Sequence, residues 1–273
     1  MTVEIFDIPA SDFILRSGAK EFHVHRSLLS LSSSFFDQML SLPQPPPKGP
    51  KEIPVVDVSE PSRVLQLLLQ FIYPVSDPII DDDLDTLLLV LHAAVKYEVL
   101  SAIQSLRRQL VSERYLKQSP TRLYAVAVYY DFEQEAKLAS KHTLGISILD
   151  VDGPLPEELR FISAESYHRL LVLRHARAKA AKELLQLRED VKCMECNGTY
   201  GAFSAGPKWW LDFQVRAAEE LSLRPTTEVI FTMEFLSKSF EQVKCSKCPL
   251  SLLQSWSFLQ ELKRKIDELP ATV

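Results

Sequence analysis

The first part of the chain alternates apolar and polar positions before it changes to a helical spacing. Residues 12–16 and 21–25 both alternate, and a Ser-Gly-Ala-Lys segment separates them, which is the pattern of a β-hairpin. After Arg26 the apolar residues recur at helical intervals, so two short helices are predicted there. A run of serines at 32–34 offers an N-cap for the second of these helices.

A third strand and further helices are predicted next. Residues 42–51 hold five prolines, which remove backbone donors and fix φ, so an exposed loop is predicted. Residues 53–58 return to a strand pattern. Helices are then predicted from Pro61, from 84 past 94, and over 100–110. This order predicts an α+β fold for residues 1–115, with a small mixed sheet capped by helices.

The rest of the chain carries helical patterns without a return to strand alternation. A polar, Pro- and Gly-containing break at 150–156 divides it into a helical extension over 116–150 and a helical C-terminal region over 151–273. Helices are predicted over 120–130, 133–144, 163–187, 209–220 and 226–240, and from about residue 250. Residues 1–115 and these two regions are the predicted domains.

Net charge and the distribution of apolar residues argue against some classes of partner. The formal net charge is -5 and the sequence pI about 5.8. Nucleic-acid binders need excess positive charge to displace counterions, so this balance argues against nucleic acid as a partner. The first ten residues lack a signal-peptide pattern, and no apolar run of membrane-spanning length occurs. We therefore expect an intracellular protein, cytoplasmic or nuclear, without a membrane partner.

Several groups of residues in the first region resemble the BTB/POZ domain over residues 12–115. They are Asp12-Phe13, Phe22-x-Val24-His25-Arg26-x-x-Leu29, Ser33-x-Phe35-Phe36, Val55-x-Asp57-Val58, Phe71-Ile72-Tyr73, and Leu88 through Ala93-Ala94 to Tyr97. The chain from Ser119 onward resembles fungal proteins in which this domain precedes helices and a cysteine-bearing tail. The resemblance implies a non-enzymatic protein–protein interaction module, often dimeric. In the family it is often a substrate adaptor for cullin-type ubiquitin ligases and sometimes a transcriptional regulator.

The resemblance also implies interface residues. Asp12 and Arg26 match the family's acidic and basic positions near the subunit interface, with an ordinary surface pair as the alternative. Eleven residues precede Asp12, Pro9 among them, which is too short for the extra helix that many dimeric members exchange. We therefore expect only weak self-association. The proline-rich loop stands where cullin adaptors contact the scaffold, so we expect cullin binding to be impaired.

The four cysteines of the chain form two C-x-x-C pairs, Cys193 with Cys196 and Cys245 with Cys248. Two such pairs can supply the four thiolates of a closed, tetrahedral, structural zinc site. The 48 residues between Cys196 and Cys245 exceed the spacing of ordinary zinc fingers, so the site would close the base of a helical hairpin. Unligated thiols, or a disulfide within each pair, are the alternatives, and a reducing compartment argues against disulfides.

Other polar groups are given structural roles. His23 and His25 share a strand face at metal-ligand spacing but lack a third ligand nearby in sequence. The helix from Ser163 carries basic residues that we interpret as a solvated face, with an acidic partner, nucleic acid or a membrane surface as the alternatives. These are Arg169, Arg174, His175, Arg177, Lys179 and Lys182.

An apolar stripe near the C-terminus is expected to dock on the helical region, the alternative being a partner-binding face. It consists of Leu252, Trp256, Leu259, Leu262, Ile266 and Leu269. The chain carries neither a nucleophile–base motif nor a paired-carboxylate signature, so no enzyme activity is predicted.

The sequence thus favours an interaction module, a scaffold or substrate adaptor that binds other proteins. The alternatives are a transcription or chromatin regulator with a zinc-stabilised C-terminal region, and a thiol-redox protein that uses its C-x-x-C pairs. The helical pattern around the cysteines argues against the redox alternative, which needs a βαβ context.

Overall fold

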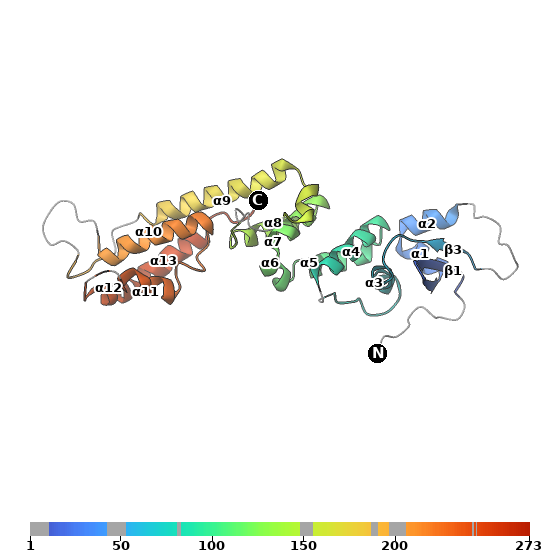
Figure 1. The fold of residues 1–273 in the computed structure, drawn as a ribbon, viewed down its shortest axis with the longest axis horizontal. Coiled ribbons are helices and arrows are strands. Elements are labelled where there is room, and N and C mark those ends of the chain that lie inside the picture. The colour runs from blue at the N-terminus through green and yellow to red at the C-terminus, as the bar shows by residue number, and fades with distance from the viewer. Residues whose placement is uncertain are drawn as a thin grey trace. The chain divides into compact units, whose positions relative to one another are not determined.

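The computed structural model describes residues 11–42, 53–80, 83–147, 155–186, 191–196, 206–241, 243 and 245–273. The chain forms two compact units, Met1–Tyr115 and Leu116–Val273 (Figure 1). Most of the predicted proline-rich loop at 42–51 and of the predicted break at 150–156 lies outside the described residues. No helix within the described ranges has both the length and the apolar character that crossing a membrane requires.

The first unit contains the predicted hairpin and the predicted third strand. Strand β1 (Phe13–Ser17) pairs antiparallel with β2 (Lys20–Val24) and parallel with β3 (Val55–Asp57), which gives the order β2-β1-β3. Gly18 occupies the hairpin turn with a φ of 58°, a conformation that favours glycine. The mixed sheet predicted from the alternating residues is therefore confirmed.

Among the described residues, five helices belong to the same unit as this sheet, and a sixth crosses the boundary to the second unit. They are α1 (Arg26–Ser32), α2 (Ser34–Ser41), α3 (Ser62–Ile72), α4 (Leu84–Lys96), α5 (Leu100–Leu110) and α6 (Glu113–Gln118). Of the serines at 32–34, Ser33 is the N-cap of α2, because its hydroxyl accepts the Phe36 N–H at 3.0 Å. Seven side chains of α3 are buried, as its apolar sequence predicts. The short helix α6 was not predicted.

A polar cluster joins the beginning of α3 to the end of α4. Lys96 Nζ donates to Glu60 at 2.5 Å, and the Tyr97 hydroxyl donates to the other oxygen of the same carboxylate. Burial raises the pKa of Glu60, but the hydrogen bonds from Lys96 and Tyr97 outweigh it and hold this pKa below its usual value. The folded structure therefore favours the ionised form of the Glu60 carboxylate.

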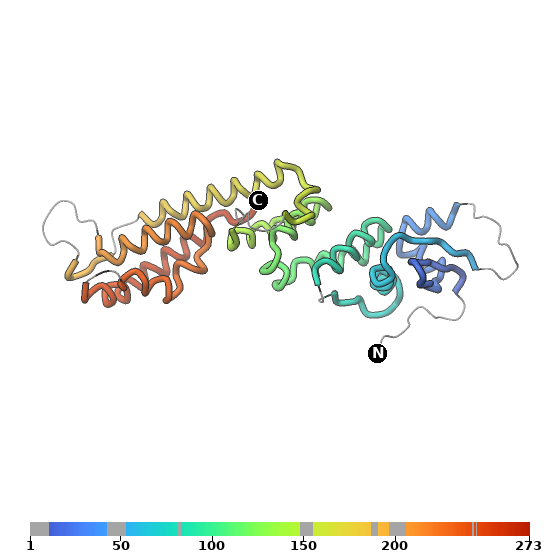
Figure 2. Tube along the Cα trace, viewed as in Figure 1, coloured from blue at the N-terminus to red at the C-terminus, as the bar shows by residue number. Residues whose placement is uncertain are grey.

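The described part of the second unit is helical. Its elements are α7 (Pro120–Tyr129), α8 (Glu133–Thr143), the 3₁₀ turn η1 (Glu157–Phe161), α9 (Ala164–Leu184), α10 (Lys208–Leu223), α11 (Met233–Glu241), α12 (Cys248–Gln254) and α13 (Trp256–Asp267). The long helix α9 packs against both α10 and α13, so helices distant in sequence lie side by side (Figure 2).

Two predicted helices of this unit differ from the structure. The helix predicted over 226–240 begins only at Met233, because the Thr232 hydroxyl accepts the Phe235 N–H at 3.2 Å and caps α11 there. The helix predicted from about residue 250 is two helices, α12 and α13, that meet at Ser255. The Ser255 hydroxyl donates to the Ser251 carbonyl four residues earlier, a bond that often bends helices.

The core of the second unit includes the predicted apolar stripe. Trp209, Trp210 and Phe213 of α10 are buried, and they belong to one cluster with the C-terminal helices. Leu252, Leu259, Leu262 and Ile266 are buried in this cluster and Leu269 packs against it, while Trp256 is 42% exposed. The stripe therefore docks on its own unit, as expected, rather than forming a free face.

The solvated basic face predicted for α9 is wrong for two of its arginines. Arg174 and Arg177 are each 6% exposed. The Arg177 guanidinium donates to the main-chain carbonyls of Pro225 at 2.9 Å, Ile266 at 2.8 Å and Pro270 at 3.1 Å, and also to that of Leu269. Helix ends leave carbonyls without intrahelical partners, so a guanidinium at the end of α13 satisfies several of them together.

Candidate metal centre

The two C-x-x-C pairs meet in the fold of the second unit. Cys193 and Cys196 lie in the described segment 191–196, Cys245 precedes α12, and Cys248 is its first residue. The four sulfur atoms lie within 4.8 Å of one another. Sγ of Cys193 is 3.7 Å from Sγ of Cys245, and Sγ of Cys196 is 3.4 Å from Sγ of Cys248.

These separations suit a single metal ion. A tetrahedral site with Zn–S bonds of about 2.3 Å has edges of about 3.8 Å between its sulfurs. The separations of 3.7 Å and 3.4 Å fall close to this edge, so four thiolates could bind one ion with small side-chain movements. All four cysteines are free rather than joined in disulfides. Such a set leaves no coordination position for substrate or water, which is the property of a structural site.

The apolar core of the second unit surrounds the cysteines. Cys193, Cys245 and Cys248 are buried and belong to the cluster that contains Trp209, and Cys196 is partly buried against it. A metal bound there would be shielded from solvent on most sides. Because the protein interior disfavours charge, burial makes a charge-neutralising metal more favourable than four separate thiolates.

Hydrogen bonds fix the polypeptide around the sulfurs. The Lys208 N–H at the start of α10 donates to Cys196 Sγ at 3.4 Å. Ser251 of α12 donates to the Lys192 carbonyl at 2.6 Å and accepts from Trp209 Nε1 at 2.9 Å. Ser251 thus joins the first cysteine segment, α10 and α12, and it supports the cysteines in the way that outer partners orient metal ligands.

Glu195 joins the two cysteine segments directly. One of its carboxylate oxygens accepts from the Ser246 hydroxyl at 2.8 Å, the Lys247 N–H at 3.2 Å and the Cys245 thiol at 3.5 Å. The hydrogen bond from Ser246 is the largest cause that lowers the pKa of Glu195. Glu195, one of the two residues between Cys193 and Cys196, therefore holds the second pair in register with the first.

The thiols differ in their acidity. Burial raises the pKa of Cys193, but the main-chain N–H groups of Cys196 and Glu195 outweigh it and lower this pKa to about 7. Burial raises the pKa of both Cys196 and Cys248 above the ordinary thiol value. Metal binding requires deprotonated sulfur, so loading this site would release protons from the thiols.

The other predicted site residues lie in the first unit. Arg26 is the first residue of α1. Asp12 is exposed, and its carboxylate accepts a hydrogen bond from the main-chain N–H of Arg26 at 2.8 Å. The Arg26 guanidinium instead lies 5.2 Å from the centroid of the Phe13 ring. The contact between the two predicted interface residues therefore runs through the Arg26 main chain and supports the N-terminus of α1.

The histidines of the strand pattern have protein partners. His23 Nδ1 lies 3.4 Å from the Ser11 hydroxyl oxygen, and His25 Nδ1 lies 3.1 Å from the Tyr73 hydroxyl oxygen. Among the described residues, the group of potential metal ligands that lie close together consists of the four cysteines. The structural interpretation of His25 agrees with its position at the N-cap of α1.

Sequence reasoning missed the residues that support the cysteines. Glu195 and Ser251 were not singled out, although a polar residue inside C-x-x-C and a serine three residues after Cys248 were visible. Their roles depend on the convergence of segments that lie far apart in the chain. The buried positions of Arg174 and Arg177 were missed for the same reason, since helical periodicity alone placed them with their exposed basic neighbours.

The first unit combines a three-stranded mixed sheet with short helices, which is an α+β architecture. Residues 8–114 match the family model of the BTB/POZ domain, so the first unit is a BTB/POZ domain, as the sequence resemblance predicted. BTB/POZ domains mediate protein–protein interaction and self-association. The resemblance of the second unit to fungal relatives stays a prediction.

The BTB domain of zebrafish PATZ1 is similar to part of the chain, with 20% sequence identity and a TM-score of 0.30. The similarity covers 36% of this chain and 73% of that chain. No curated protein matches the sequence.

Proposed function

We propose that this protein is a non-enzymatic adaptor, in which the BTB/POZ domain binds one protein and the second unit binds another. The observation that carries the proposal is the occurrence of an interaction domain together with a helical unit whose cysteines form a closed cluster. A closed four-sulfur site contributes to folding and offers no open position for chemistry. We therefore assign to the second unit the role of a stable surface that binds a partner protein.

Structural zinc is part of this proposal. Thiolates select soft or borderline metals, and a tetrahedral set of four sulfurs is typical of zinc. The cluster joins segment 191–196 to the start of α12, and α10 and α11 lie between them in sequence. Zinc would therefore close a long helical insertion at its base and hold its ends together.

Elemental analysis of freshly purified full chain tests the zinc assignment. We expect about one equivalent of zinc and four thiols that do not react with a thiol reagent until the protein is unfolded. A matched control variant, Ser257→Ala, changes an exposed serine of α13 that makes none of the hydrogen bonds described around the sulfurs, and it should retain the metal. Less than about a tenth of an equivalent of zinc, with four freely titratable thiols in the folded protein, would refute the assignment.

Comparison of captured partners tests the adaptor function. The full chain is used as bait beside a charge-reversal variant on the exposed surface of the BTB/POZ domain, Lys20→Glu, and one on the second unit, Lys247→Glu. An adaptor predicts two sets of partners, each reduced by a change in one unit only. If every partner depends on the same unit, the two-surface proposal fails, whatever the metal content.

Three partner and compartment assignments belong to the same proposal. Self-association is expected to be weak, and light scattering of the full chain across protein concentrations measures it; a dimer that persists below micromolar concentration would contradict this. Binding to a purified cullin, followed by calorimetry, tests the ligase-adaptor role. An intracellular, reducing location is supported by the four free cysteines, since secreted proteins commonly oxidise theirs.

A further inference from the structure

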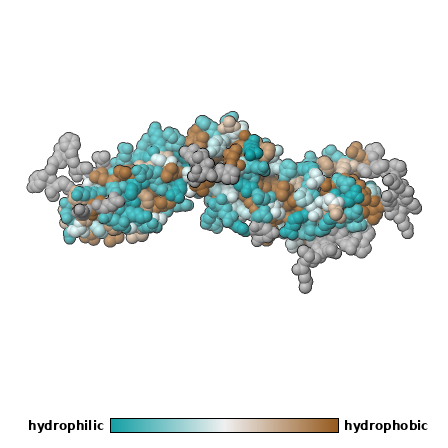
Figure 3. Space-filling model, in the orientation of Figure 1, coloured by the Kyte–Doolittle hydropathy of each residue, from teal (hydrophilic) through white to brown (hydrophobic). Residues whose placement is uncertain are grey.

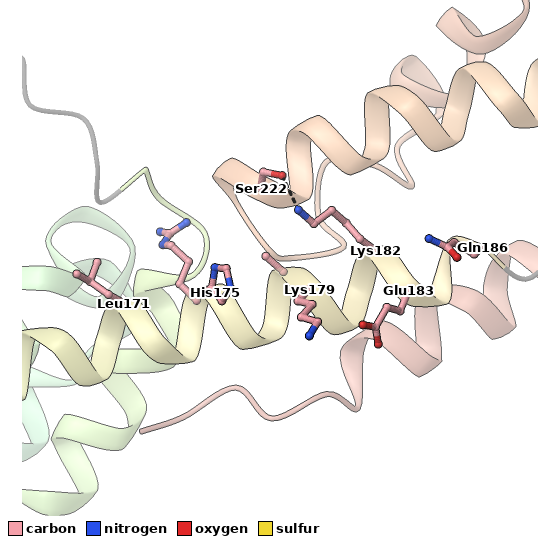
Figure 4. Close-up of a pocket in the computed structure, with 9 residues that line it drawn as sticks. Leu171, His175, Lys179, Lys182, Glu183, Gln186 and Ser222 are labelled. Atoms are coloured by element: carbon pink, nitrogen blue, oxygen red, sulfur yellow. Dashed lines mark hydrogen bonds between the residues drawn. The ribbon is translucent and has the colours of Figure 1, made fainter.

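A groove in the second unit runs along α9 beside the end of α10 (Figure 4). It has a volume of about 540 Å³. Leu171 and Ala178 supply apolar lining, and Ser222 of α10 lines the opposite side. The described lining residues all belong to the second unit.

The groove is basic although the chain as a whole is acidic. Among the described residues that line it, Arg174, Lys179 and Lys182 are cationic and Glu183 supplies the one carboxylate. Lys182 extends towards α10, where its Nζ donates to the Ser222 hydroxyl at 3.1 Å (Figure 4). The formal net charge of the whole chain is -5, so this local excess of cations is a departure from the average composition. Figure 3 shows that hydrophilic residues dominate the visible surface around these helices.

Arg174 gives the groove a cation that is not neutralised. Its side chain is only 6% exposed, and its two terminal nitrogens donate to the carbonyls of Thr143, at 2.8 Å, and of Ile146 and Leu223. Its Nε is buried and has no hydrogen-bond partner among the described residues. Carbonyl dipoles solvate a guanidinium but carry no net charge, so a negative group brought into the groove would compensate this cation.

We propose that this groove binds an acidic segment of a partner protein, with aspartate or glutamate side chains beside Arg174, Lys179 and Lys182 and an aliphatic side chain against Leu171 and Ala178. From Leu171 to its end at Leu184, α9 extends for about 20 Å, which matches about six residues of extended chain. The apolar lining favours a peptide over a simple anion, since an anion would leave it uncovered. This proposal rests on the adaptor function and names the class of its second partner.

The probe is a fluorescein-labelled peptide of nine residues that contains four glutamates and two leucines, with a control peptide in which glutamines replace the glutamates. Anisotropy is measured with the full chain at moderate salt. We expect saturable binding of the acidic peptide and at least about tenfold weaker binding of the glutamine peptide. Random duplex DNA and inorganic phosphate serve as competitors, because each carries negative charge without leucine side chains.

Two charge-reversal variants test the location, Lys179→Glu and Lys182→Glu. Each should weaken binding of the acidic peptide by about tenfold. Arg169→Glu is the matched control, because it makes the same charge change on the same helix, at a side chain that is 65% exposed and outside the groove lining. It should leave the affinity within about twofold. Equal thermal midpoints of the variants show that all are folded.

The outcomes separate this proposal from the adaptor function. Equal binding of the two peptides, or equal effects of Arg169→Glu and the groove variants, would overturn the proposal. Tighter binding of duplex DNA with the same sensitivity to Lys179→Glu would also overturn it and assign the groove to nucleic acid. Absence of any peptide binding would overturn the proposal that the groove binds an acidic segment. It would leave the two-surface capture experiment unaffected, because that experiment does not depend on this groove.

Discussion

Replacement of the buried Arg177 is the most direct test of what holds the second unit together. Its guanidinium donates to four main-chain carbonyls, those of Pro225, Ile266, Leu269 and Pro270. Arg177→Met keeps much of the side-chain volume and removes every one of these donors. The carbonyls near the end of α13 are then left without their charged partner in a buried environment.

The expected loss of unfolding free energy in Arg177→Met follows from the number of hydrogen bonds removed and from the desolvation of the guanidinium, which opposes it. Four charge-assisted hydrogen bonds at about 1.5 kcal/mol each amount to about 6 kcal/mol. Burial of the guanidinium costs several kcal/mol, as the lowering of its pKa by burial also indicates, and methionine avoids that cost. We therefore expect the unfolding free energy of the second unit to fall by about 3 kcal/mol.

Tryptophan fluorescence during urea denaturation isolates this effect. All three tryptophans, Trp209, Trp210 and Trp256, belong to the second unit, so the signal reports that unit alone. With a slope of about 2 kcal/mol per molar urea, a loss of 3 kcal/mol moves the midpoint down by about 1.5 M. Arg169→Met, at an exposed arginine of the same helix, is the control and should change stability by less than about 0.5 kcal/mol. An unchanged or higher midpoint for Arg177→Met would show that desolvation cancels the carbonyl bonds and would refute the reasoning.

Three further predictions concern single groups. Cys248→Ser should abolish zinc binding and lower the fluorescence-monitored melting temperature by about 10 °C or more, since metal binding is linked to folding. Ser33→Ala should cost about 1–2 kcal/mol in denaturation followed by circular dichroism, because its hydroxyl caps α2 and donates to the Tyr97 carbonyl at 2.5 Å. Glu60→Gln should flatten the acid side of the stability profile: the pKa of Glu60 is lowered from 4.5, so its contribution is present above that pH and is lost as pH falls through the folded-state pKa.

Each of these has a contradicting result. A full equivalent of zinc in Cys248→Ser would show that the other three thiols suffice and that the site is not a four-sulfur one. A loss below about 0.3 kcal/mol for Ser33→Ala would mean that water replaces both of its bonds. Identical stability profiles of wild type and Glu60→Gln between about pH 3 and pH 6 would mean that the carboxylate has the same pKa in the unfolded chain.

Local signals in the sequence predict the elements well where packing agrees with them. The helix predicted over 100–110 coincides with α5, and the alternating residues on either side of Gly18 predicted the hairpin that the structure contains. The helix predicted over 226–240 started too early, because the apolar side chain of Ile230 resembles part of a helical face. In the structure Ile230 is buried in the core before α11 begins, and the cap at Thr232 sets the start of the helix.

The candidate site shows the limit of local reasoning. The spacing within each C-x-x-C pair was enough to predict that four sulfurs could meet, and the structure brings them within 4.8 Å. No local pattern could show that Glu195 would join both segments, because its partners are Ser246 and Lys247, about fifty residues away. Arg177 was misinterpreted for the same reason, since its acceptors lie at the ends of elements that the helical period of α9 does not describe.

The long separation between the two cysteine pairs also has a consequence for biosynthesis. Forty-eight residues lie between Cys196 and Cys245. At a translation rate of about 5–20 residues per second, the second pair leaves the peptidyl-transferase centre about 2–10 seconds after the first. During that interval a nascent chain exposes two thiols whose partners do not yet exist, and the insertion with α10 and α11 must be synthesised first. Completion of the four-sulfur cluster therefore waits for the synthesis of α10 and α11, and early capture of the first pair by another thiol would compete with it.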